Sequence, residues 1–189
     1  LSVINIDRWA SLTGSFALAL GSEKLANLLL GSQVVRRFLR ASPGSTDMAY
    51  INRIHTLAAS GNYDVIIADM ASFGHAYAQL HITSLGLMLF RAGPMHRMFM
   101  EMKTWLENKE ANSVVLVTIP EELPALETLD FFPRIEKIGF RIASVICNIC
   151  LDSNLPKKPE NDELQQVWSL YDFKVRNQGE WISRLESAW

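Results

Sequence analysis

Short apolar runs alternate along the chain with longer stretches in which apolar residues recur every three or four positions. Three runs rich in β-branched residues predict buried strands at Val65–Asp69, Val114–Ile119 and Ile142–Asn148, and Leu1–Asp7 predicts a short one. Strands that alternate with helices favour a parallel sheet. The expected fold class is therefore α/β, a mostly parallel, doubly wound sheet with flanking helices.

The amphipathic stretches between these runs predict the helices. They cover residues 22–40, 48–61, 74–90, 95–108, 123–139 and 164–189. Gly93-Pro94 separates the third helix from the fourth, and Pro133 is expected to kink the fifth. One α/β domain is expected over residues 1–189, incomplete at both ends, with a small helical insertion at 76–110.

Composition and charge argue against some classes of function. The 189 residues are 49% hydrophobic and 20% charged, with a net charge of −2 and no basic stripe, so no nucleic-acid partner is expected. Cys147 and Cys150 do not make a disulfide scaffold and fit a reducing, cytoplasmic location. Their Cys-x-x-Cys spacing is open to two interpretations, a metal or redox site and a pair of packing thiols.

The stretch around Asp69 carries the first candidate chemistry. An acid at the carboxyl end of a parallel strand lies where open α/β sheets bind ligands. Asp69 could hold a magnesium ion through water, and Gly74 could bring a backbone N–H to a phosphate. The alternative interpretation is that Asp69 caps the following helix.

A second group of candidates follows the next two strands. Pro120 ends one of them, and Glu121 stands at the start of the next helix, where the helix dipole favours an acid. Asn148 ends the other strand. Its amide carries both a donor and an acceptor and could read the edge of a purine.

Four stretches, in this order, resemble the ArsA-type anion-transporting ATPases and the related cytosolic ATPases that target tail-anchored proteins. The resemblance covers about residues 42–189. The matching stretches are Asp69-Met-Ala-Ser-Phe-Gly-His-Ala76, Thr118-Ile-Pro-Glu-Glu-Leu-Pro-Ala-Leu-Glu-Thr128, Cys147-Asn148 and, loosely, Arg176-Asn-Gln-Gly-Glu-Trp-Ile182. The Ile-Pro-Glu segment is the most specific of the four.

The resemblance implies a P-loop NTPase that binds ATP and magnesium. Asp69 and Gly74 are then catalytic, with magnesium held by Asp69 through water. His75 is a possible switch residue that senses the nucleotide, although a solvated histidine fits the sequence equally well.

The same resemblance assigns nucleotide binding to Pro120, Glu121 and Asn148. It also implies a homodimer or pseudodimer in the cytoplasm, peripheral to a membrane. The expected partners are a membrane transporter or a hydrophobic client.

The chain departs from the family at the phosphate site. These ATPases use a Gly-rich loop ending in Gly-Lys-Thr, and Gly21-Ser-Glu-Lys24 does not satisfy that pattern. Met70 and Ala76 stand where the family has hydroxyl side chains. Two interpretations stay open: a piece of a longer ATPase whose loop lies upstream, and a non-catalytic interaction protein that has lost the loop.

A methionine-rich pair of helices is the last candidate. It combines Leu87-Met-Leu-Phe90 with Met95, Met98, Met100 and Met102. Flexible thioethers suit a promiscuous apolar groove for a client. A plain hydrophobic core and a dimer face are the alternatives.

Overall fold

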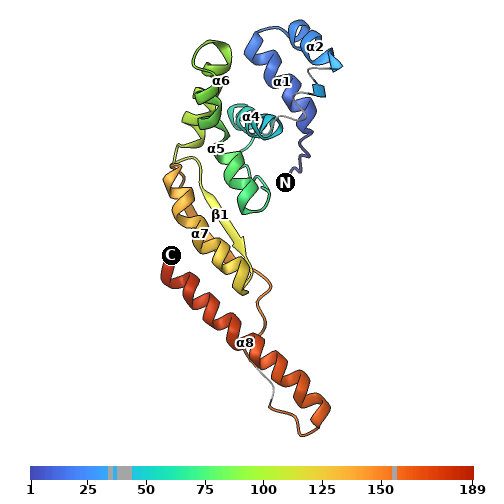
Figure 1. Cartoon of the computed structure of the whole chain (residues 1–189), viewed down its shortest axis with the longest axis vertical. Coiled ribbons are helices and arrows are strands. Elements are labelled where there is room, and N and C mark those ends of the chain that lie inside the picture. The colour runs from blue at the N-terminus through green and yellow to red at the C-terminus, as the bar shows by residue number, and fades with distance from the viewer. Residues whose placement is uncertain (34–35, 38–43, 155–156) are drawn as a thin grey trace. The chain divides into compact units, whose positions relative to one another are not determined.

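The computed structural model describes residues 1–33, 36–37, 44–154 and 157–189 (Figure 1). The chain divides into two compact units, Leu1–Asn108 and Lys109–Trp189. The first unit contains the helices α1 (Arg8–Leu20), α2 (Glu23–Gly31), α4 (Ser45–Ala59), α5 (Phe73–Leu89) and α6 (Gly93–Leu106). The second contains β1 (Val114–Thr118), α7 (Glu122–Lys137), β2 (Ile142–Cys147) and α8 (Asp162–Ala188).

The first unit is a helical assembly around an apolar core. Helix α1 packs against α2 and α4, and α4 packs against α5. The Asp7 side chain accepts a hydrogen bond from the Ala10 N–H at 2.9 Å, which satisfies one of the free amides at the start of α1. Fully buried side chains, including Leu12, Ile51 and Met102, fill the space between the helices.

Helices α5 and α6 form a tight hairpin in this unit. A Cβ atom on Gly86 would lie only 2.3 Å from the Phe99 ring, so glycine lets the two helices approach closely. The rings of Phe90 and Phe99 stack with centroids 5.9 Å apart. Of the methionines in the pair, Met98 and Met102 are buried whereas Met88 and Met100 are exposed, so the core interpretation holds for the first two only.

The second unit is a β-α-β element with a long final helix. Strands β1 and β2 pair in parallel, with Thr118 opposite Cys147, and α7 is the crossover between them. Helix α8 packs against α7 through a cluster of Ala125, Trp181 and Leu185. The parallel pairing expected for these two strands is confirmed.

The expected doubly wound sheet is wrong. The described residues are mostly helical and contain only this two-stranded parallel sheet. The run Val65–Asp69 has no strand structure, and Val65 and Ile67 are 76% and 90% exposed. Leu1–Asp7 is not a strand either. Strands need a hydrogen-bonded neighbour, and the regular elements described in the first unit are helices, which satisfy their backbone groups internally.

The helix predictions agree better with the structure. Residues 48–61, 74–90 and 95–108 correspond to α4, α5 and α6, and α6 begins earlier, at Gly93, because Pro94 fits the first helical turn. Helix α7 continues through Pro133. Residues 34–35 and 38–40 of the helix expected at 22–40 lie outside the described residues. None of the helices described is both long and apolar enough to cross a bilayer.

Candidate functional site

The carboxyl ends of β1 and β2 lie side by side in the second unit. The Asn148 N–H donates to the Thr118 carbonyl at 2.7 Å, which extends the parallel ladder one residue past β2. This bond places Asn148 next to the point where β1 ends, two residues before Pro120. We call the group of Thr118, Pro120, Glu121 and Asn148 the strand-end rim.

Pro120 and Glu121 make the turn from β1 into α7. Pro120 is buried, and the Glu121 N–H donates to the Ile119 carbonyl at 2.8 Å, closing a tight turn. Glu121 has extended backbone (φ −122°) at the N-cap position of α7, and its carbonyl accepts from the Ala125 N–H at 3.0 Å. Its side chain makes no capping hydrogen bond and is exposed, so the carboxylate is free to face a ligand or solvent.

Asn148 uses one end of its amide and leaves the other open. Its Oδ1 accepts from the Ile149 N–H at 2.9 Å, and the exposed Nδ2 has no partner among the residues the structure describes. Ile149 has φ 54°, a left-handed conformation that costs a β-branched residue free energy. The rim therefore presents the two N–H donors of Asn148 Nδ2, while one lone pair of its Oδ1 is already used.

Helix α8 holds the segment that follows β2. The Gln178 side chain accepts from the Leu151 N–H and donates to the Leu151 carbonyl, both at 2.8 Å. The Tyr171 hydroxyl donates to the Asp152 carbonyl at 3.1 Å. Gln178 is buried, and sequence reasoning missed this role because a single glutamine within an amphipathic helix gives no signal of a partner 27 residues away.

The two cysteines differ in their surroundings. Cys147 packs against the cluster of Ala125, Trp181 and Leu185, whereas Cys150 is exposed. Burial, and secondly the hydrogen bond and charge of Cys150, raise the pKa of Cys147 from its ordinary 9.0 to about 11. Cys147 therefore stays a neutral packing thiol at physiological pH. In the described ranges no group of three or more His, Cys, Asp or Glu residues is arranged to hold a metal ion.

Asp69, Gly74 and His75 lie in the first unit, apart in the chain from the strand-end rim. Asp69 is exposed in a segment without regular structure, and its backbone carbonyl accepts from the Tyr50 hydroxyl at 3.0 Å. The N-cap of α5 is Ser72, so Asp69 does not cap that helix. The expectation that Asp69 ends a strand is wrong, because the residues before it form none.

Gly74 is the second residue of α5, and the first helical hydrogen bond there runs from the Ala76 N–H to the Ser72 carbonyl at 2.9 Å. The Gly74 N–H therefore belongs to the first turn, where amides have no partner within the helix. A Cβ on Gly74 would meet nothing within 4 Å, so packing does not require glycine there. His75, the next residue, is exposed.

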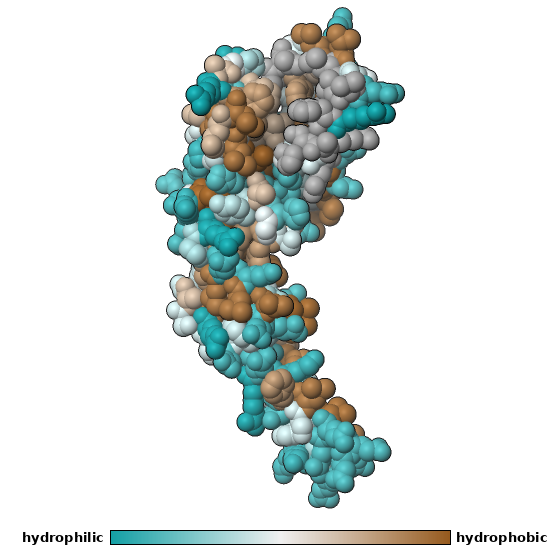
Figure 2. Space-filling view, viewed as in Figure 1, coloured by the Kyte–Doolittle hydropathy of each residue, from teal (hydrophilic) through white to brown (hydrophobic). Residues whose placement is uncertain are grey.

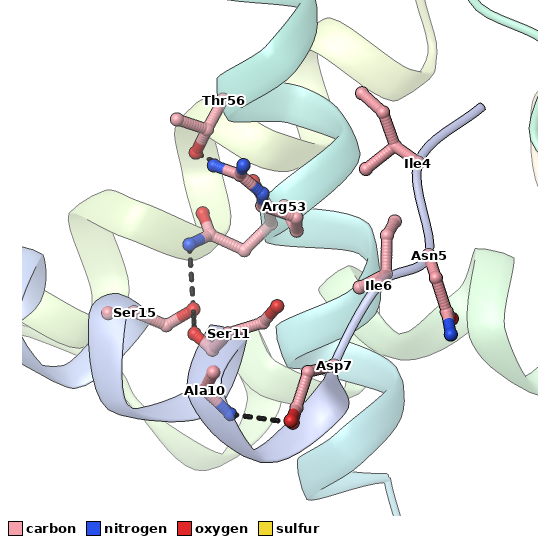
Figure 3. A pocket seen from close by; sticks show the side chains of 11 residues that line it. Ile4, Asn5, Ile6, Asp7, Ala10, Ser11, Ser15, Arg53 and Thr56 are labelled. Atoms are coloured by element: carbon pink, nitrogen blue, oxygen red, sulfur yellow. Dashed lines mark hydrogen bonds between the residues drawn. The ribbon is translucent and has the colours of Figure 1, made fainter. Parts of the chain in front are cut away.

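A further pocket, of about 450 Å³, lies between the N-terminal segment, α1 and α4 (Figure 3). The buried Asn52 lies at its wall and donates to the Ser15 hydroxyl at 2.7 Å, which in turn donates to the Ser11 carbonyl at 2.8 Å. None of the sequence-predicted site residues lines this pocket. Asn52 was missed because its neighbours Ile51 and Ile54 mark α4 as an ordinary core helix.

No protein-family model matches the chain, and no curated protein is significantly similar to it. Whether the site suits ATP and magnesium is therefore argued from the chemistry of its own residues. The rim offers one side-chain donor, the exposed Asn148 Nδ2, which a purine ring nitrogen could accept. Magnesium usually takes one or two carboxylates together with waters and phosphate oxygens, and Asp69 can supply one carboxylate.

Proposed function

We propose that the protein is an ATP-binding switch protein of the ArsA-like kind, which couples its nucleotide state to a transport or targeting partner. The observation that carries this proposal is the strand-end rim. The hydrogen bond from the Asn148 backbone N–H to the Thr118 carbonyl fixes Asn148 next to the end of β1, at the carboxyl edge of two parallel strands. That edge is where open α/β sheets bind nucleotides.

The rim recognises the base in this proposal. The Asn148 Nδ2 donates to a ring nitrogen of adenine, while its Oδ1 stays on the Ile149 N–H. The buried Pro120 and the turn at Glu121 fix the chain where β1 ends, next to Asn148. Neutral hydrogen bonds contribute only about 1 kcal/mol each, so the rim supplies selectivity more than affinity.

The first unit carries its own candidate contacts for magnesium and phosphate, which are proposed separately from the rim. Asp69 holds magnesium through water, the Gly74 N–H faces a phosphate oxygen, and His75 senses the nucleotide. Magnesium, when bound, neutralises charge on the phosphates during phosphoryl transfer, for which positioning supplies most of the catalysis. A dimer and a membrane transporter or hydrophobic client as partner belong to the same proposal.

A non-catalytic interaction protein is the second candidate. Two sequence observations favour it. The 189 residues contain no Gly-Lys-Thr loop, and Met70 and Ala76 bring no hydroxyl to the segment around Asp69. In this case the strand-end rim has the same structure, and the protein does not hydrolyse ATP.

NMR titration of the full chain separates the base contact from the phosphate contact. Adenosine should shift the Asn148 side-chain amide only, pyrophosphate with magnesium should shift the Gly74 amide only, and ATP with magnesium should shift both. The expected ATP dissociation constant is about 1 mM or weaker, because a 1 mM constant already requires about 4 kcal/mol and each neutral hydrogen bond supplies only about 1 kcal/mol.

A matched pair of variants controls the titration. Asn148→Asp keeps the Oδ atom that accepts from Ile149 and removes the Nδ2 donor, so it should abolish the adenosine response. Asn62→Asp makes the same change at an exposed position of the first unit and should leave it intact. An Asn148 amide that does not respond to millimolar adenosine would refute the nucleotide proposal and favour the non-catalytic one.

A further inference from the structure

The tip of the α5–α6 hairpin exposes a contiguous set of apolar side chains. Met88 is 71% exposed and Leu89 78%, and Leu85 and Phe90 are exposed beside them. They occupy the last turn of α5 and the residue after it. In the view of Figure 2, apolar side chains gather over the part of the first unit that includes α6. We call Leu85, Met88, Leu89 and Phe90 the hairpin tip.

The hairpin tip is held in a formed turn. The Phe90 N–H donates to the Gly86 carbonyl at 2.9 Å, and the Phe90 carbonyl lies 2.8 Å from His96 Nδ1. Phe90 also stacks on Phe99, and Gly93 supplies the positive φ of 85° that the turn requires. Docking would therefore cost little ordering of the backbone, because the apolar side chains already stand on a fixed scaffold.

The charged residues closest in the sequence to the hairpin tip are cations. From Met70 to Met100 the sequence contains no Asp or Glu, although the chain as a whole carries a net charge of −2. The two arginines in that stretch, Arg91 and Arg97, are both exposed and lie within eight residues of Leu89. Exposed apolar side chains flanked by cations and free of acids are the chemistry that an anionic membrane interface selects.

We infer that the hairpin tip docks on an anionic lipid surface. Met88 and Leu89 enter the boundary between headgroups and acyl chains, and Arg91 and Arg97 contact lipid phosphates. An apolar protein segment would bury the same methionine and leucine but would gain nothing from the two arginines. The inference is independent of nucleotide binding, since none of the residues in the strand-end rim takes part.

Vesicle flotation with the full chain tests the inference. The protein should float with vesicles of phosphatidylcholine mixed with phosphatidylglycerol and not with phosphatidylcholine vesicles, and salt should weaken the binding. Leu89→Ser should weaken it by about tenfold, from the lost apolar burial. Arg91→Gln and Arg97→Gln should each weaken it about fivefold.

Matched substitutions on α2 serve as controls. Leu28 is 74% exposed in the same unit, so Leu28→Ser removes an equally exposed leucine, and Lys24→Gln removes an exposed cation. Both should bind vesicles like the parent chain, and circular dichroism should show equal helix content in every variant. Equal flotation with both vesicle types, or unchanged binding by Leu89→Ser, would overturn the inference. Self-association without vesicles that Leu89→Ser abolishes would also overturn it, by assigning the hairpin tip to a second copy.

Discussion

Two runs of this chain share one sequence pattern and take different structures. Tyr63–Asp69 and Val114–Thr118 are both rich in β-branched residues, and both lead into a turn before a helix. The second run is β1, hydrogen-bonded along β2, with Leu116 buried. The first has no strand structure and exposes Val65 and Ile67. The pattern thus does not by itself make a strand.

The difference lies in what each unit places beside the run. In the second unit the crossover α7 returns the chain so that β2 lies parallel to β1, and their backbone groups satisfy one another. In the first unit the run lies between α4 and α5, whose backbone groups are already satisfied internally. The neighbouring helices therefore give the backbone groups of this run no hydrogen-bonding partners.

The largest expected effect separates the two runs directly. Leu116→Ala should lower the free energy of unfolding of the second unit by about 2–5 kcal/mol, because it leaves a cavity beneath β1. Ile67→Ala should change the stability of the first unit by no more than about 0.5 kcal/mol, because Ile67 is exposed. Urea titration of both variants measures this, and equal costs would show that Ile67 is buried in solution.

A smaller effect concerns one side chain in each unit that holds an irregular segment by hydrogen bonds. Gln178→Ala should cost about 1–3 kcal/mol, because the Leu151 N–H and carbonyl lose both partners. Tyr50→Phe removes one hydrogen bond to the exposed Asp69 and should cost under about 1 kcal/mol. Gln166→Ala, at an exposed position of α8, should be neutral in the same urea titrations. A Gln178→Ala chain as stable as Gln166→Ala would show that the Leu151 contact contributes nothing.

Apart from α1, which was not predicted, the sequence predicted the described helices because their hydrogen bonds are local and their apolar spacing indicates one buried face. Met48, Ile51 and Ile54 marked the buried side of α4, and the structure buries all three. It also predicted that the runs at Val114 and Ile142 would pair in parallel, since strands that alternate with helices favour a parallel sheet.

Contacts between distant parts of the chain could not be predicted in this way. The strand expected at Val65–Asp69 depended on a neighbour that periodicity does not reveal. Methionine content could not separate the buried Met98 and Met102 from the exposed Met88 and Met100, because only packing decides which face is covered. The hydrogen bonds between the Gln178 side chain and Leu151 likewise depend on tertiary structure.

Hydrogen–deuterium exchange of the full chain tests the central claim most directly, that among the described residues the strand pair lies in the second unit and the run at 65–69 forms no strand. Amides inside the ladder, including that of Asn148, should exchange far more slowly than unstructured peptide. Amides of residues 65–69 should exchange at nearly the unstructured rate. Protection of residues 65–69 equal to that of β1 would contradict the account, because it would show that this run has a strand partner after all.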